Sequence, residues 1–241
     1  REYNCPFYHG KDVVGKNEFK KIVGSALGAA VPTKSKREHV DKYLDHISEI
    51  IRELFENTHK HGRTDHLENV LATNFRVVIF NSVDVTNHRL MELATSGVDG
   101  LFSFILECQM WMDKYKKNIP VLDITVVDAG PGYARKWTGK SKNELTLEEE
   151  IDAVYDCFQK NNSSGNNDAD GSGLTHILSD LAKVRGWFRL RTGSVSVSKS
   201  FFFGGRKSGI TKGDIRYTGE FVEGTSVNIV IPLVDIADGD F

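Results

Sequence analysis

The chain has 241 residues, of which 39% are hydrophobic and 27% are charged, so it can bury the core of one large domain or two small ones. Its formal net charge of -2 argues against a protein built mainly to neutralise nucleic-acid phosphates. The three cysteines, Cys5, Cys108 and Cys157, are too widely separated for a zinc site or a disulfide framework. We therefore expect a reducing, cytoplasmic compartment.

The hydropathy of the chain and its first residues bear on targeting. No apolar run approaches the about 20 residues that a membrane-spanning helix requires, and residues 1–6 lack the charged-then-apolar pattern of a signal peptide. We expect no membrane partner. Because the chain begins with Arg1, we expect a processed or trimmed protein that further domains can precede or follow.

The N-terminal quarter predicts an extension and a long helix. Residues 1–36 form an N-terminal extension with little pattern of its own, in which residues 17–29 predict a small helix. Between residues 36 and 61, apolar residues recur three and four positions apart, which is typical of one long amphipathic helix. Gly62 ends this helix, at the usual C-terminal position for glycine.

The central part of the chain predicts a strand, a helix and a second strand. Residues 75–85 are rich in Val, Ile and Phe and predict a strand, and residues 88–117 predict one long helix. Residues 121–127 predict a buried strand that runs directly into a turn, DAGPG, over residues 128–132.

The C-terminal part predicts two helices followed by strands. The helices cover residues 145–159 and 174–184, and the polar stretch over residues 161–173 predicts a mobile loop between them. Four strands are expected at residues 187–191, 195–203, 214–221 and 226–232. This order favours an α+β fold, a two-layer sandwich with a mixed β-sheet covered on one face by helices.

Polar residues line one side of the first long helix near its C-terminal end. Helical geometry places these residues close together at the rim of the apolar stripe: Glu53, Asn57, Lys60 and His61. Such a row is often a solvated face that supports pairs four residues apart. Asn57 favours a binding role instead, because Asn is a poor helix former and here follows a Glu by four positions.

Three glycine-containing segments could form the rest of a binding site. Asp128, in the turn over residues 128–132, can accept a hydrogen bond from an exocyclic amine, and its glycines let a flat ring approach the backbone. Residues 171–174 place backbone N–H groups at a helix N-terminus, where phosphate binds well. Thr225 could bring a hydroxyl next to Asp128. Taken singly, these are equally a tight turn, a helix cap and a turn residue.

Together the four segments resemble a known superfamily. The stretch ELFENTHKHG over residues 53–62, the turn at 128–132, GSGL at 171–174 and Gly224-Thr225 follow the order and spacing of the N, G1, G2 and G3 boxes of GHKL ATPases. The resemblance covers residues 36–233, and its N box is most similar to that of the serine kinases that act as anti-sigma factors. It implies a Bergerat-type ATP-binding domain over residues 37–241, with a helical insertion at about 88–118.

For the phosphate end, the resemblance implies specific ligands. Asn57 would bind Mg²⁺ through its side-chain oxygen, and Glu53 would orient or deprotonate the attacking group. Lys60 or His61 would contact phosphate. The expected cofactors are therefore ATP and Mg²⁺, which suits a reaction that depends mainly on positioning and charge stabilisation.

For the base end and the lid, the resemblance implies further contacts. Asp128 would bind the adenine amine, Gly130 and Gly132 would shape the base pocket, and Thr225 would support Asp128. Gly171 and Gly173 would act as hinges of a lid. The G2 segment as a whole would contact ATP through four residues: Gly171, Ser172, Gly173 and Leu174.

Departures from the superfamily leave several functions open. The G2 box has a single G-x-G, the insertion separates the N and G1 boxes, and no helical hairpin with a phosphoacceptor His is evident, since His39 and His46 are interpreted as surface residues. The leading hypothesis is an ATPase or a protein kinase that acts on a partner protein. The alternatives are an ATP-gated clamp that dimerises or docks a partner, and a partner-binding module with a degenerate nucleotide site.

Overall fold

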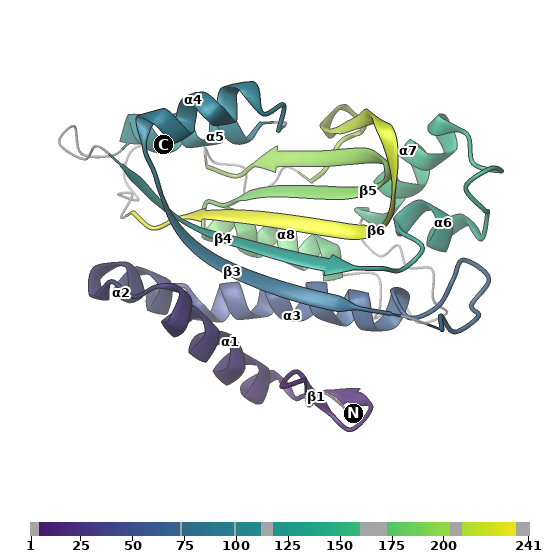
Figure 1. The fold of residues 1–241 in the computed structure, drawn as a ribbon, viewed down its shortest axis with the longest axis horizontal. Coiled ribbons are helices and arrows are strands. Elements are labelled where there is room, and N and C mark those ends of the chain that lie inside the picture. The colour runs from purple at the N-terminus through teal and green to yellow at the C-terminus, as the bar shows by residue number, and fades with distance from the viewer. Residues whose placement is uncertain are drawn as a thin grey trace.

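The structure is a computed structural model that describes residues 5–72, 74–98, 100–111, 118–159, 173–202 and 209–234. Its helices are α1 (Lys16–Ala30), α2 (Lys34–Lys42), α3 (Leu44–His61), α4 (Asn87–Thr95), α5 (Leu101–Trp111), α6 (Tyr133–Thr138), α7 (Leu147–Cys157) and α8 (Gly173–Lys183). Its strands are β1 (Tyr8–His9), β2 (Asp12–Val13), β3 (Arg76–Val85), β4 (Ile119–Asp128), β5 (Trp187–Ser200) and β6 (Ile215–Pro232). The fold is α+β, a two-layer sandwich of helices on a sheet (Figure 1).

The main sheet has four strands in the order β3-β4-β6-β5, and each neighbouring pair is antiparallel. The prediction of a mixed sheet was therefore wrong. The last two strands are also longer than expected. The strands predicted at 187–191 and 195–203 form the single strand β5, and those predicted at 214–221 and 226–232 form the single strand β6. A shift of register near Gly193 lets β5 bend and continue, which is how a bulge preserves a strand that a sequence pattern divides.

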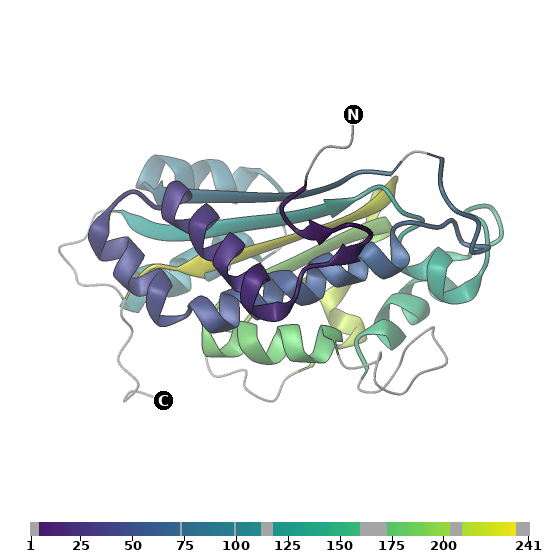
Figure 2. The same cartoon turned by 90° about the horizontal axis from the view of Figure 1, so that it is seen from below.

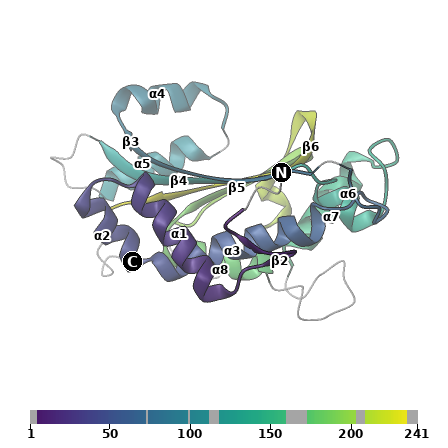
Figure 3. The same cartoon turned by 60° about the horizontal axis from the view of Figure 1, so that its bottom comes forward.

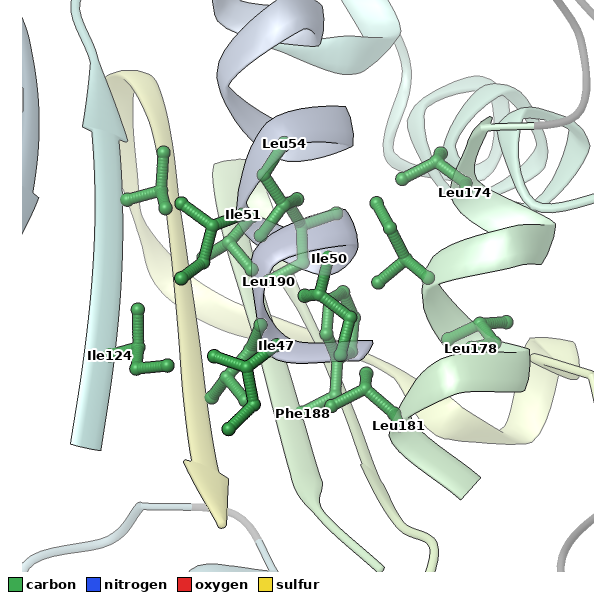
Figure 4. Close-up of a cluster of buried hydrophobic side chains, with 14 of the residues drawn as sticks. Ile47, Ile50, Ile51, Leu54, Ile124, Leu174, Leu178, Leu181, Phe188 and Leu190 are labelled. Carbon is green, nitrogen blue, oxygen red and sulfur yellow. The ribbon is translucent and has the colours of Figure 1, made fainter. Parts of the chain in front are cut away.

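One face of the sheet carries the main layer of helices. Figures 2 and 3 show α1, α3 and α8 on this face. Figure 4 shows apolar side chains of α3 and α8 packed against those of β4 and β5. The labelled residues are Ile47, Ile50, Ile51 and Leu54 of α3, Leu174, Leu178 and Leu181 of α8, Ile124 of β4, and Phe188 and Leu190 of β5. All ten belong to the same buried cluster, so the recurrence of apolar residues on α3 has the packing role expected from its spacing.

A second, smaller core lies on the other face of the sheet. Alternation along β4 sends Ile124 to the main core and Val121 to the opposite side, where Val121 packs with Phe104 and Ile105 of α5. Figure 3 shows α4 and α5 above this face. The prediction that helices cover only one face therefore needs correction at this end of the sheet.

Two helices that were predicted to be continuous are interrupted. The helix expected over residues 36–61 is divided into α2 and α3 at Tyr43, whose backbone (φ -111°, ψ 9°) leaves the helical region. The helix expected over residues 88–117 is divided into α4 and α5, because Gly97 and Gly100 both have positive φ, a conformation that a helix does not continue through. Residues 112–117 lie outside the described residues.

The N-terminal residues pack on the helix that carries the candidate site. Helix α1 agrees with the helix predicted over residues 17–29, and it buries Phe19, Val23 and Leu27 in the main core. The ring of Phe19 lies 5.9 Å from that of Phe55 of α3. The division of the chain into an extension and a domain at residue 36 stays a prediction.

Candidate functional site

A pocket of about 850 Å³, including the space that opens to solvent, lies between α3, α6, α8, the end of β4 and the middle of β6. Seven of the predicted site residues line it: Asn57, His61, Asp128, Gly132, Gly173, Leu174 and Thr225. Segments that are distant in the sequence therefore meet at one cavity. The other lining residues are Leu54, Thr58, Gly62, Val126, Tyr133, Lys136, Trp137, Cys157 and Val227.

Helix α3 presents Glu53 and Asn57 at the rim because its apolar stripe is packed below them. Leu54 and Phe55 are each 2% exposed, and this packing fixes the rotation of the helix. Glu53 and Asn57 are then half-buried and face the start of α8. A β-carbon on Gly173 would lie 2.8 Å from Glu53 Oε2 and 3.9 Å from Asn57 Oδ1. The start of α8 therefore approaches both polar side chains as closely as it does because residue 173 is glycine.

The charge state of Glu53 is set by burial and by its neighbour. Burial raises the pKa of Glu53, and the Arg52 guanidinium opposes this shift. Arg52 Nη2 lies 2.6 Å from Glu53 Oε1, and the same guanidinium also contacts Glu49 and Glu56. Glu53 thus has one oxygen held by a cation and the other directed at Gly173, an arrangement that suits a carboxylate kept in a fixed orientation.

At the other end of the pocket, Asp128 closes β4 with a buried carboxylate. Its Oδ1 accepts a hydrogen bond of 2.8 Å from the N–H of Gly130, and it also receives the hydroxyl of Thr225, its partner in the β4-β6 ladder. Asp128 is only 9% exposed, and burial raises its pKa to about 6 despite these donors and the Arg76 cation. The carboxylate can therefore gain from a further donor in the pocket.

Glycines bring backbone segments together around Asp128. A β-carbon on Gly130 would lie 2.6 Å from the Cα of Gly62, so the turn after β4 touches the end of α3 through backbone alone. Gly132 has φ +82°, and a β-carbon there would lie 2.6 Å from Thr192 Oγ1. Both contacts are closer than side chains normally allow.

The remaining predicted residues do not line the pocket. Glu53, the predicted catalytic residue, lies beside Gly173 but is not among the lining residues. Lys60 is exposed and is not among the residues that line the pocket, whereas His61 of the same turn lines it. Gly130 supports Asp128 and packs against Gly62 without lining the cavity. Gly171 and Ser172 lie outside the described residues.

The sequence interpretation missed the contribution of α6. This six-residue helix follows Gly132 directly and adds Tyr133, Lys136 and Trp137 to the lining of the pocket. Its aromatic residues close to a predicted base site were a usable signal, but so short a helix has no periodicity to detect. Cys157 also lines the pocket, and burial raises the pKa of its thiol to about 12.

Comparison of the sequence with protein-family models and with curated proteins gave no match. Within the described part of the chain, no helix combines the length and the apolar character needed to cross a membrane. The same residues contain no cluster of three or more His, Cys, Asp or Glu side chains arranged to hold a metal ion.

Proposed function

We propose that this chain binds Mg-ATP in the pocket between α3, α6 and α8 and acts as an ATPase or a protein kinase. The observation that carries the proposal is that Asn57 and Asp128, from segments more than 70 residues apart in the sequence, line a single cavity together with Gly173 and Thr225. A nucleotide needs a metal-binding oxygen at one end and a base-reading acceptor at the other.

The residues of the pocket fit a purine nucleotide. Asp128 is a buried acceptor with a raised pKa, and a base amine would supply the donor that its ionised form favours. Gly132 removes a side chain beside it, and Trp137 and Tyr133 line the same cavity with flat apolar surface. This combination of apolar walls and few polar groups is typical of small-molecule sites.

The residues near Gly173 fit the phosphate end. Asn57, which lines the cavity together with Gly173, would hold Mg²⁺ through its side-chain oxygen. When bound, the metal ion would neutralise phosphate charge. Glu53 would orient or deprotonate the attacking water or hydroxyl. Its proximity to Gly173 favours this role, because phosphoryl transfer depends on positioning.

The experiment separates binding from turnover. ATP binding with Mg²⁺ would be measured by calorimetry, and γ-phosphate release by a phosphate assay, for the wild type, Glu53→Ala, Glu53→Gln and Asn57→Ala. Both Glu53 variants should bind ATP and lose release about 100-fold or more, whereas Asn57→Ala should lose the Mg²⁺ dependence of binding.

A matched control is Glu38→Gln on α2, whose exposed side chain pairs with Lys34 and is expected to leave both measurements unchanged. Failure of the wild type to bind ATP would overturn the proposal. Binding of ATP with neither phosphate release nor transfer of phosphate to a protein would overturn the enzymatic part and leave an ATP-gated clamp. Mass measurement with a non-hydrolysable ATP analogue would then test for a nucleotide-dependent dimer.

A further inference from the structure

Lys136 of α6 is a buried cation in the wall of the pocket. Its side chain is 7% exposed, and the residue lines the cavity together with Asp128 and Trp137. Its Nζ lies 2.6 Å from Glu68 Oε1 and donates to Thr64 Oγ1 at 2.7 Å. A lysine so deeply covered keeps its charge only where partners hold it.

The ion pair with Glu68 is unlike a surface pair. The side chain of Glu68 is 73% exposed, whereas that of Lys136 is 7% exposed and belongs to a residue that lines the pocket. One turn later on the chain, Lys140 pairs with Glu149 at 2.5 Å, and both side chains are 42% exposed. Of these two pairs, only Lys136–Glu68 joins an exposed carboxylate to a covered cation whose residue lines the proposed nucleotide pocket.

The loop that carries Glu68 is built to hold that residue in place. Asp65 Oδ1 accepts the backbone N–H groups of Leu67 and Asn69 at 2.8 and 2.9 Å. Glu68 itself has φ +67°, a conformation that non-glycine residues rarely adopt. The loop therefore keeps the carboxylate behind the Lys136 ammonium at the expense of local backbone energy.

Contacts of the same loop place the ammonium at the base end of the pocket. Thr64, which accepts from Lys136, is two residues from Gly62, and Gly62 packs directly against Asp128 and Gly130. Glu53 and Gly173 meet near the middle of α3, nine residues before Gly62. Through Thr64 and Gly62, Lys136 is thus linked to the end of the pocket that holds Asp128, the predicted base acceptor.

We propose that Lys136 donates a hydrogen bond to the nucleoside half of the ligand, to an acceptor on the base or the ribose, and that Glu68 and Thr64 position it. This inference rests on the proposed function. An ammonium has three donor hydrogens, and two are directed at Glu68 and Thr64. Asp128 would accept a hydrogen bond and the Lys136 ammonium would donate one. Together the two groups could bind a donor and an acceptor on the same purine nucleoside.

The test compares three ligands that share parts of ATP. Affinities for ATP, adenosine and inorganic tripolyphosphate would be measured with Mg²⁺ by displacement of a fluorescent ATP analogue from the full chain. Lys136→Met should weaken ATP and adenosine alike by about 10- to 100-fold, the range for a hydrogen bond to a charged group. Tripolyphosphate should be unaffected, and Lys140→Met should leave all three affinities unchanged.

A second variant covers the case in which Lys136→Met does not fold. Lys136→Arg keeps a cation for Glu68 but moves the donor hydrogens, so it should retain the thermal unfolding temperature and still lose affinity for ATP and adenosine. Unchanged affinities with a lowered unfolding temperature would mean that the pair only fastens the loop to α6, and would overturn the inference. A loss confined to ATP and tripolyphosphate would overturn it as well. A wild type that does not bind ATP would refute the proposed function itself.

Discussion

Replacing Asp128 with Asn is expected to stabilise the nucleotide-free protein at pH 8 while removing the proposed affinity for ATP. Burial raises the pKa of Asp128 from 3.8 to about 6, and each pKa unit corresponds to about 1.4 kcal/mol. Keeping this carboxylate ionised in the fold therefore costs up to about 3 kcal/mol at pH 8. Asn can still accept from the N–H of Gly130 but carries no charge, so Asp128→Asn should recover part of that energy.

The sign of the pH dependence makes the prediction specific. The folded protein takes up the Asp128 proton near pH 6, whereas the unfolded chain does so only near pH 4. The free energy of unfolding of the wild type therefore increases relative to Asp128→Asn as the pH falls from about 7 to about 4. Urea unfolding of both proteins at pH 8 and pH 5 measures this, since other groups titrate equally in both. A difference in stability that does not change with pH would refute the reasoning.

Three further substitutions follow from the contacts of the pocket. Gly173→Ala places a methyl group 2.8 Å from Glu53 Oε2 and should displace that carboxylate. The rate of phosphate release should then fall about 10-fold or more, with less effect on the dissociation constant of ATP. An unchanged rate of phosphate release would contradict this prediction. Arg52→Met removes the cation that lowers the pKa of Glu53, so the acidic limb of the pH–rate profile should move to higher pH, and a limb at the same pH would exclude Glu53 as its source. Gly130→Ala forces a β-carbon to within 2.6 Å of the Gly62 Cα, and thermal unfolding should show that the free energy of unfolding falls by about 1–3 kcal/mol. An unchanged free energy of unfolding would mean that the two segments separate easily and would contradict this prediction.

The sequence predicted the parts of the fold that depend on local pattern. The apolar stripe of α3 is buried as its spacing indicates, because one face of a helix must pack if the helix is to be stable in a small domain. The apolar run before Asp128 forms β4, because a strand lets its apolar side chains be buried alternately in the two cores on opposite faces of the sheet. The meeting of Asn57 and Asp128 at one pocket was inferred from the order of four short motifs and not from any one of them.

The parts that were missed depend on tertiary contacts. Nothing in the spacing of apolar residues marks Tyr43 as the end of α2, since the pattern continues through it. In the sequence, Lys136 is indistinguishable from a surface lysine, because Glu68 and Thr64, which contact it in the fold, are about 70 residues earlier in the chain. The strand directions of the sheet were likewise beyond a local reading, because they depend on how the connections cross the molecule.

Both ends of the candidate site depend on one helix. Glu53 meets Gly173 near the middle of α3, and Gly62 meets Asp128 just beyond its end, so nine residues of helix, about 13 Å in length, separate the two groups of contacts. A helix is stiff over this distance, and the spacing between Glu53 and the contacts of Asp128 is therefore set by backbone geometry more than by the loops around the pocket. Substitutions that tilt α3, including those at Phe19 beneath it, should weaken both ends together, whereas changes at Gly132 should act on the base end alone.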